Sequence, residues 1–450
     1  MTSNGDANMN QTEKMTSRLS RRSIVRRSAM AAGAAVLAAQ TTRAPAQQTG
    51  TMAGRKYRAF VRFNNGAAVE DLTLKAISPR QVVVRTEASQ CCYSISGQAL
   101  GTTPFTPARV LGHGGVGIVE AVGSQVHRVQ VGDRVIVANT PQCGQCYACL
   151  HGRPDRCQMG TFAGEPLAAI ANMKDGTPVV EHNNQGGFGE LMVPWEEYCI
   201  PVFTSVSPVE LAMLACVGAC GLGTTINIAP VEVASDVCVL GCGPLGLSAI
   251  QGARIKGASR IIAVDPVKYR RELALKLGAT IALDPNVEGK GLVEKIRELC
   301  KGPTDRKLSG GRNWTAANND RGPDFVIEAS GGDQFVPKVE AGPDPTGILQ
   351  LQQAWDMVSG TGHIVTVSVG QKGNFSLPGG QWSNGHKNHH PGNMAGTHTM
   401  RDMPRFVRLI ETGQFDAKSL VAATFPLDRT KDAFQLVADR SIIAAVIVFS

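Results

Sequence analysis

Residues 236–265 read DVCVLGCGPLGLSAIQGARIKGASRIIAVD, and this stretch determines how the rest of the sequence is interpreted. An apolar run of strand length is followed by Gly241, Gly243 and Gly246 in the spacing G-x-G-x-x-G. The first glycine allows a tight turn, the second lets the backbone approach a pyrophosphate, and the third lets a helix pack closely on the strand. Residues 245–256 are predicted to form that helix, with its N-terminal amides facing phosphates.

The residues after this helix indicate which dinucleotide is bound. A second apolar run ends at Asp265, 19 residues after Gly246, where a carboxylate binds the adenosine ribose hydroxyls and repels a 2′-phosphate. NAD is therefore favoured over NADP. Pro244 and Leu245, at the start of the helix, are also expected to contact the cofactor. Arg270 either lies beside the ribose or is a solvated charge on the next helix.

Composition and charge describe an ordinary globular enzyme of two or three domains. The chain has 450 residues, of which 43% are hydrophobic and 18% charged, and no apolar run of 18 residues. Of the formal charge of +8, +5 falls on residues 1–46, which hold seven basic and two acidic residues, and +3 on the rest. Such a balance gives no reason to expect a nucleic-acid partner, and no membrane span is expected.

Residues 1–46 have the layout of a targeting segment. A basic region precedes a modestly apolar stretch at 29–39, and Ala-Pro-Ala at 44–46 fits an A-x-A cleavage site. Residues 20–26, SRRSIVR, resemble the twin-arginine signal of proteins that are exported already folded. We therefore expect export to the periplasm or beyond, with the twin-arginine translocase as a transient partner. The alternative is a disordered leader ahead of a true start at Met52, which would leave the protein in the cytoplasm.

The cysteines give the most specific signal. Four of the 12 cysteines stand as C-x2-C-x2-C-x7-C in the lobe 139–157, namely Cys143, Cys146, Cys149 and Cys157. Four thiolates in a loop can close a tetrahedron around Zn²⁺, and such a site is full, so its role is structural. An iron–sulfur cluster and unligated core cysteines are the alternatives.

The chain as a whole predicts two kinds of domain. Short alternating β runs fill residues 47–221, and βα alternation, which predicts a doubly wound parallel sheet, fills residues 222–397. Residues 398–450 end in a β run that is expected to rejoin the first domain. Residues 301–322 and 371–396 are expected to be irregular loops. The second loop contains His386, His389 and His390, which are expected to be exposed to solvent rather than to form a further metal site.

These motifs together resemble the zinc-dependent medium-chain alcohol dehydrogenases. The resemblance rests on the four-cysteine lobe, on LGHGGVGIV at 111–119, on VGDRV at 131–135 and on the glycine fingerprint, and it covers residues 56–449. It implies an α/β protein with a GroES-like β-rich catalytic domain, carrying the structural zinc lobe, and a Rossmann cofactor domain. Cys92, His113 and Cys220 together disfavour the zinc-free quinone reductases of the same superfamily.

The resemblance also implies a second, catalytic zinc. In the segment ASQCCYS, Cys92 matches the first ligand, although Cys91 could take its place; His113 matches the second and Cys220 the third. Two thiolates and a neutral imidazole leave the fourth position open for water or an alcohol. Thr224 is placed among the cofactor-binding residues. The remaining cysteines of this region are interpreted as small core residues: Cys216, Cys238 and Cys242.

Ser94 matches the hydroxyl that accepts the proton of the alcohol in this family. Three positions depart from the family pattern. Gly114 stands where a glutamate is usual, Ile95 where an aspartate is usual, and Gly97 where some members have a histidine that ends the proton relay. The groups that surround the catalytic zinc must therefore differ from the usual ones.

The resemblance implies an oxidoreductase that transfers hydride between a primary or secondary alcohol, or its aldehyde, and NAD, with two zinc ions per chain. A homodimer or homotetramer is expected. Two other functions stay open. One is an exported nicotinoprotein that keeps NAD bound and passes electrons to another acceptor. The other is a zinc-stabilised binding protein without catalysis.

Overall fold

The computed structural model describes residues 52–159, 168–301 and 322–450. These described residues form one compact unit. The segment 1–46, expected to be an export signal, and most of the predicted insertion at 301–322 lie outside the described residues.

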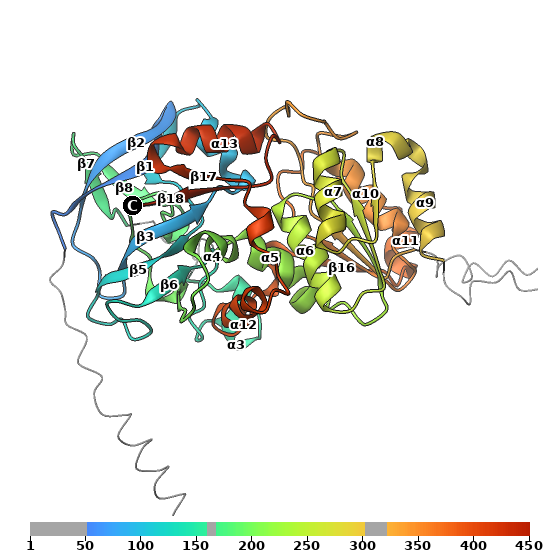
Figure 1. Ribbon diagram of the computed structural model, residues 1–450, viewed down its shortest axis with the longest axis horizontal. Helices are drawn as coiled ribbons and strands as arrows, with labels where there is room; N and C mark the ends of the chain where they lie inside the picture. Colours follow the sequence, from blue (N-terminus) through green and yellow to red (C-terminus); the bar gives the residue numbers. More distant parts are fainter. Residues whose placement is uncertain (1–51, 160–167, 302–321) are drawn as a thin grey trace, which may run out of the picture. The chain divides into compact units, whose positions relative to one another are not determined.

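Five strands near the beginning of the chain close into a barrel (Figure 1). They follow the order β1-β2-β7-β8-β4, and β4 closes the barrel by pairing with β1. Alternate residues such as Tyr57, Ala59 and Val61 are buried together inside it, as the period of a strand requires. The strands are β1 (Lys56–Asn64), β2 (Gly66–Leu74), β4 (Phe105–Val110), β7 (Ala171–Met173) and β8 (Pro178–Glu181).

A second sheet combines both ends of the described chain. Its order is β10-β6-β5-β3-β18-β17, with β9 pairing β3. The last strand, β18, runs antiparallel to β3, so the end of the chain returns to the β-rich part. The strands are β3 (Val82–Gln90), β5 (Gly115–Val122), β6 (Arg134–Val137), β9 (Leu191–Met192), β10 (Cys199–Pro201), β17 (Ala423–Pro426) and β18 (Ala445–Val448).

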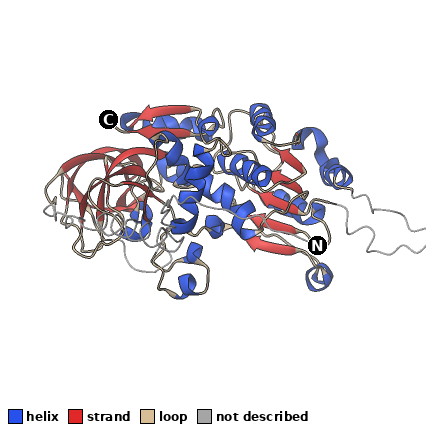
Figure 2. Cartoon of the chain, turned by 60° about the horizontal axis from the view of Figure 1, so that its bottom comes forward, coloured by secondary structure: helices blue, strands red, loops and turns tan. Residues whose placement is uncertain are grey.

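The third sheet is fully parallel, in the order β13-β12-β11-β14-β15-β16. Successive residues of β11 alternate between two cores. Val237 and Val239 pack with α6 (Pro244–Ile255), whereas Cys238 and Leu240 pack with α9 (Leu292–Leu299) and α10 (Ile348–Met357). Helices therefore cover both faces, which confirms the doubly wound fold (Figure 2). The strands are β11 (Asp236–Leu240), β12 (Arg260–Val264), β13 (Ile281–Leu283), β14 (Phe325–Glu328), β15 (His363–Thr366) and β16 (Asn388–Pro391).

The expectation of an irregular segment at 371–396 was wrong in part. Asn388–Pro391 forms β16, which pairs in parallel with β15. His390 Nε2 lies 2.9 Å from His363 Nδ1, and His389 Nε2 lies 3.0 Å from Thr366 Oγ1. These two histidines are held at the edge of the sheet and are not free in a loop.

The chain forms three helical pieces between residues 208 and 228. α4 ends at Leu214 and α5 begins at Val217, because Cys216 between them has φ −143° and ψ −88°, outside the helical region. The pieces are α4 (Pro208–Leu214), α5 (Val217–Gly223) and the π-helical η6 (Thr224–Ile228).

The remaining helices are short or cover the sheets. Among the described residues, no single helix is long and apolar enough to cross a membrane. One bent pair of helices, Pro208–Leu214 with Val217–Ile228, has the length and composition of a membrane span, and only these two properties point to one. The α-helices are α2 (Ser96–Leu100), α3 (Tyr147–Leu150), α6 (Pro244–Ile255), α7 (Lys268–Leu277), α8 (Pro285–Glu288), α9 (Leu292–Leu299), α10 (Ile348–Met357), α11 (Gly379–Asn384), α12 (Thr399–Glu411) and α13 (Thr430–Ala438). The 3₁₀ turns are η1 (Tyr93–Ile95), η2 (Pro154–Arg156), η4 (His182–Asn184), η5 (Glu196–Tyr198), η7 (Gly289–Gly291), η9 (Asn393–Gly396), η10 (Lys418–Leu420) and η11 (Leu427–Arg429).

Candidate metal centres and cofactor cavity

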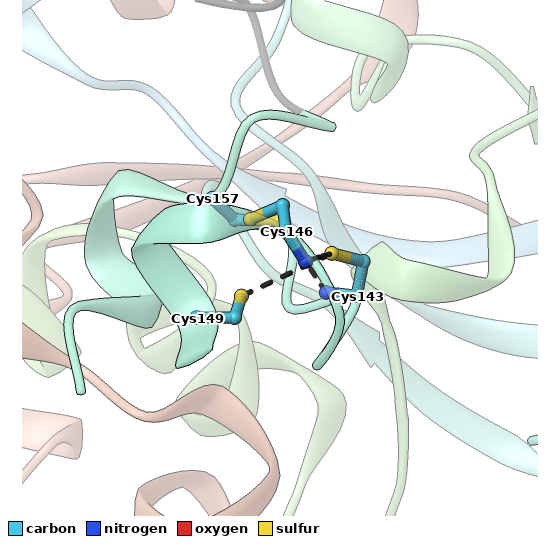
Figure 3. A group of neighbouring side chains, drawn as sticks. All are labelled: Cys143, Cys146, Cys149 and Cys157. Carbon is cyan, nitrogen blue, oxygen red and sulfur yellow. Dashed lines mark hydrogen bonds between the residues drawn. The ribbon is translucent and has the colours of Figure 1, made fainter. Parts of the chain in front are cut away.

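Four cysteine side chains converge around α3 and η2 (Figure 3). The sulfur atoms of Cys143, Cys146, Cys149 and Cys157 all lie within 4.8 Å of one another, and all four are free thiols. Cys157 is buried and the other three are partly exposed. The structure thus brings together the four cysteines that the sequence predicted. Four sulfur donors at this spacing fit a tetrahedral Zn²⁺ with no free coordination position.

Backbone amides stabilise negative charge on these sulfurs. The Cys143 and Cys146 N–H groups donate to Cys157 Sγ and Cys143 Sγ, both at 3.3 Å, and the Gln158 N–H donates to Cys146 Sγ at 3.4 Å. Burial raises the pKa of Cys146, but hydrogen bonds from Gln158 and from the neighbouring cysteines outweigh it and lower the pKa to about 6. The loop is therefore shaped to hold thiolates, the form that binds metal.

A second cluster joins Cys92, His113 and Cys216. One donor atom from each residue lies within 4.8 Å of the other two. The Cys92 and Cys216 sulfurs are 4.0 Å apart, and Cys216 Sγ is 3.7 Å from His113 Nδ1. Hydrogen bonding with Cys216 lowers the pKa of Cys92 well below its usual range, against burial, which raises it. Two sulfurs and one imidazole are the donor set of a zinc site that keeps a fourth position open.

Three distant segments build this second cluster. Cys92 follows β3, and the Cys91 N–H donates to Ala445 O of β18, so the returning end of the chain fixes that ligand. His113 lies in the turn between β4 and β5, next to Gly114, which has φ +83°. A Cβ on Gly114 would lie 2.0 Å from Val137 O, so this turn has no room for the glutamate that is usual at this position.

The third ligand differs from the prediction. Cys216, which was interpreted as a core residue, belongs to the cluster, and Cys220, which was predicted to be the ligand, does not. Cys216 precedes α5 and Cys220 lies one turn later, with its N–H donating to Cys216 O at 2.9 Å. Residues four apart share a helix face, so the spacing alone could not separate them. Cys220 lines the same cavity as the cluster, and Asn139 Nδ2 lies 3.3 Å from Cys216 Sγ and 3.7 Å from Cys220 Sγ, so the two sulfurs are neighbours.

Two further polar groups adjoin this cluster. Ser94 Oγ lies 3.1 Å from Cys92 Sγ, which places the predicted proton acceptor beside the metal ligands. His182 Nε2 lies 3.2 Å from His113 Nε2, and sequence reasoning missed this residue because no motif surrounds it. Burial lowers the pKa of His182 well below its usual range, and His113 and Arg109 lower it further. His182 is therefore a neutral imidazole at neutral pH.

One cavity of about 450 Å³ connects the second cluster to the dinucleotide fingerprint. Its wall includes Cys92, Ser94, His113 and Cys216 from the β-rich part and the α5 region. The predicted cofactor-binding residues that also line it are Gly241, Gly243, Pro244, Leu245, Asp265 and Arg270. A ligand bound across the fingerprint therefore has direct access to the metal cluster.

The three glycines have the separate roles that their spacing predicts. Gly241 has φ +93°, and a Cβ there would lie 2.8 Å from backbone atoms of Ser330. Gly243 has open space on its Cβ side and precedes the first turn of α6, where a phosphate can meet the helix amides. A Cβ on Gly246 would lie 1.8 Å from Gly241 O, so this glycine allows the close packing of helix and strand and does not line the cavity.

Asp265 and Arg270 lie together at the end of β12. The carboxylate accepts hydrogen bonds from the Cys242 N–H at 2.7 Å and the Val267 N–H at 2.8 Å, which leaves further lone pairs for ribose hydroxyls. Burial lowers the pKa of Arg270, but the charge of Asp265 and the interactions with Tyr269 and Cys242 together outweigh burial and raise that pKa. Thr224, predicted to bind the cofactor, does not line the cavity: it is fully buried, and its hydroxyl donates to Gly221 O at 2.6 Å.

A polar bridge joins the two walls of the cavity. Gln334, in the segment between β14 and α10, donates from Nε2 to Tyr93 O at 2.8 Å and accepts from the Gly97 N–H at 2.9 Å. Its own N–H donates to the Tyr93 hydroxyl at 2.9 Å. A Cβ on Gly97 would lie 2.8 Å from Gln334 Oε1. The glutamine amide therefore takes the space beside Gly97, where some members of the resembled family have a histidine.

Comparisons with known proteins indicate a family for this chain. Two family models match, Alcohol dehydrogenase GroES-like domain over residues 78–204 and Zinc-binding dehydrogenase over residues 244–341. Putative alcohol dehydrogenase D of Mycobacterium tuberculosis is 28% identical over 400 residues, 87% of this chain and 100% of that protein. Alcohol dehydrogenase 1 of Pisum sativum is 31% identical over 263 residues, 56% of this chain and 69% of that protein. The solved structure of benzyl alcohol dehydrogenase from Acinetobacter calcoaceticus matches with a TM-score of 0.72 at 26% identity, over 88% of this chain and 100% of that chain.

Proposed function

This chain belongs to the zinc-dependent medium-chain alcohol dehydrogenases, and on that premise we propose that it interconverts a primary or secondary alcohol and its aldehyde or ketone with NAD. The observation that carries the proposal is the shared cavity. A single space of about 450 Å³ is lined by the Cys92–His113–Cys216 cluster and by the dinucleotide fingerprint. Hydride transfer requires the alcohol carbon and the cofactor to lie in contact, and this cavity allows it.

The cofactors are Zn²⁺ and a nicotinamide dinucleotide. We assign one zinc to the four-cysteine lobe and one to Cys92, His113 and Cys216. The choice of NAD over NADP is supported by Asp265, whose buried carboxylate lines the cavity and would repel a 2′-phosphate. When bound, the zinc supplies Lewis acidity at the alcohol oxygen, and the nicotinamide ring accepts the hydride.

The chain's own residues supply orientation and proton transfer. Cys92 and Cys216 are buried, at 9% and 6% exposure, so the chemistry takes place away from bulk water. Ser94 Oγ lies 3.1 Å from Cys92 Sγ and faces the same cavity, and it takes the hydroxyl proton of the alcohol. Tyr93 and Val217, each adjacent to a cysteine of the cluster, give the cavity wall an uncharged character there, which suits a neutral alcohol.

The test is absorbance at 340 nm on zinc-loaded protein with NAD and a panel of aliphatic and aromatic alcohols. We expect a rise that is lost in Cys92→Ala and retained in Cys238→Ala, a control cysteine buried in the core away from the cavity. No rise with any alcohol would contradict the proposal. In that case, release of NAD on denaturation would favour a nicotinoprotein with another electron acceptor, and full zinc occupancy without NAD would favour a binding protein.

We further propose that residues 1–46 direct export through the twin-arginine translocase. The paired Arg21 and Arg22 support this proposal. Replacing both by lysine is expected to keep the protein in the cytoplasm, and unchanged export would contradict the assignment.

We also propose that the enzyme is a homodimer or homotetramer. Light scattering measures the molar mass of the purified protein, and the mass of a monomer would refute this proposal.

A further inference from the structure

The two ring nitrogens of His113 have different neighbours. Nδ1 lies 3.7 Å from Cys216 Sγ, on the side of the metal cluster, and Nε2 lies 3.2 Å from His182 Nε2. The two rings are 5.0 Å apart between centroids and tilted by 37°. An imidazole that binds a metal through one nitrogen carries its proton on the other, and that proton is normally given to an acceptor. The acceptor within reach of His113 is His182.

The fold fixes His182 at this place. It follows β8, which pairs in parallel with β4, the strand that leads to His113, in a register that sets Val110 opposite Glu181. The turn is closed by the Gln185 N–H, which donates to His182 O at 3.1 Å. The ring is 6% exposed and lines the cavity. Its position therefore depends on the pairing of two strands and not on a flexible loop.

The other nitrogen of His182 shows that this residue is not present for packing alone. Nδ1 is buried and has no hydrogen-bond partner within the described part of the chain. A buried polar atom without a partner costs folding free energy, so an apolar side chain would be favoured here if stability were the only requirement. A histidine at this position is consistent with a role for its Nε2.

We infer that His182 is a positioning residue for the zinc: its Nε2 accepts the proton of His113 Nε2, so that His113 Nδ1 is unprotonated on the side that faces Cys216 Sγ. His182 is not itself a metal ligand. It performs the task that a carboxylate or carbonyl performs for most metal-bound histidines. The inference rests on the proposed function only in assigning a metal to this cluster, and alcohol turnover is not needed to test it.

The test compares two polar substitutions that differ by one methylene group. His182→Gln places an amide oxygen near the position of Nε2 and keeps an acceptor, whereas His182→Asn reaches only the position of Nδ1 and loses it. The full chain is loaded with Zn²⁺, and metal retention is measured by competition with a chelator. We expect His182→Asn to weaken zinc binding at this site by about 10-fold to 100-fold. His182→Gln should stay within about threefold of the unmodified protein.

The cobalt-substituted protein gives a second readout, because the ligand-field spectrum reports the geometry of the metal site. The contribution of the four-cysteine lobe is subtracted by means of Cys92→Ser, which lacks the other site. His390→Asn is the matched control: His390 contacts His363 through its Nε2, which asparagine does not reach, and it lies outside the cavity. It is expected to change neither metal binding nor the spectrum.

Two results would overturn the inference: His182→Asn binding zinc as tightly as the unmodified protein with the same cobalt spectrum, or His182→Gln losing as much affinity as His182→Asn. Should the asparagine variant fail to fold, His182→Leu, which also lacks an acceptor, replaces it with the same expectation. Because no substrate is present, a protein that oxidises no alcohol but shows the expected difference would refute the proposed function and support the role of His182.

Discussion

The two metal-binding clusters of this protein are built in opposite ways. The four-cysteine cluster takes all its donors from residues 143–157, and three of its four side chains are partly exposed. The Cys92–His113–Cys216 cluster takes its donors from three separate segments, buries both sulfurs and opens on a cavity. The first would fill the coordination of a bound Zn²⁺ and stabilise a loop, whereas the second would leave a position for a reacting molecule.

The comparison teaches that each site depends on a different level of structure. The first needs only a short loop with the right spacing. The second needs the pairing of β18 with β3 beside Cys92, the tight turn at Gly114, and the break between α4 and α5 at Cys216. Changes in the first are therefore expected to affect stability, and changes in the second to affect chemistry.

The largest expected effect tests which cysteine completes the second cluster. Cys216→Ser should remove one of two zinc ions and lower kcat/KM by about 10³-fold or more, because a Lewis acid contributes several kcal/mol to the transition state. Cys220→Ser, the matched neighbour one helical turn away, should keep both zinc ions and lose about threefold or less, since its sulfur lies outside the cluster. Zinc content and steady-state rates measure both. If Cys220→Ser lost more zinc and more activity than Cys216→Ser, Cys220 would be the third ligand.

The next effect concerns the four-cysteine lobe. Cys146→Ser should also remove one zinc ion, but kcat/KM at 25 °C should fall by less than about fivefold, because this cluster does not line the cavity. The loss should appear in stability: about 2 kcal/mol would lower the Tm by roughly 5 °C for a domain of this size. Calorimetry and limited proteolysis near residue 146 measure it. An unchanged Tm would mean that the lobe folds without its metal, and the contrast between the two clusters would fail.

A third expectation uses the exposure and charge of the thiols once the metals are removed. Cys146 is partly exposed with a pKa of about 6, so its thiolate fraction increases as the pH rises through 6 and is nearly complete above pH 7. Alkylation of metal-free protein by iodoacetamide should follow this curve. Cys216 is buried and hydrogen bonds with Cys220 and Cys92 raise its pKa, so it should react at least about tenfold more slowly at pH 7. Peptide mapping distinguishes them, and equal rates would show that the second cluster opens without its metal.

The same contrast explains what the sequence could predict. The four cysteines and the glycine fingerprint lie within short stretches, and local spacing determines their geometry, so both were found before the structure. The doubly wound sheet followed from the alternation of apolar strands and helices, which depends on period and composition. These features depend on local sequence, and each of them is present in the structure.

The features that were missed depend on the path of the backbone or on distant parts of the chain. Cys216 and Cys220 are four residues apart, and their spacing does not reveal that Cys216 lies at the break between α4 and α5. Asn388–Pro391, with the sequence NHHP, has no apolar run and forms a strand because β15 lies beside it. His182 meets His113, 69 residues away, only through the pairing of β8 with β4.

The smallest expected effect tests how far the second cluster's cavity depends on contacts between its walls. Gln334→Ala removes the hydrogen bonds of its amide to Tyr93 O and the Gly97 N–H, each of which contributes about 1 kcal/mol. Because Gln334 is not among the metal-cluster residues, zinc content should stay at two ions and kcat should be unchanged, while the KM for NAD rises by roughly threefold to tenfold as the walls separate more easily. Gln352→Ala, on the exposed side of α10, is the control and should change neither constant. If Gln334→Ala instead lost zinc from the Cys92–His113–Cys216 cluster, the metal site would depend on the closure of the cavity as well as on its three segments, and the contrast with the self-contained lobe at 143–157 would be sharper than the distances alone indicate.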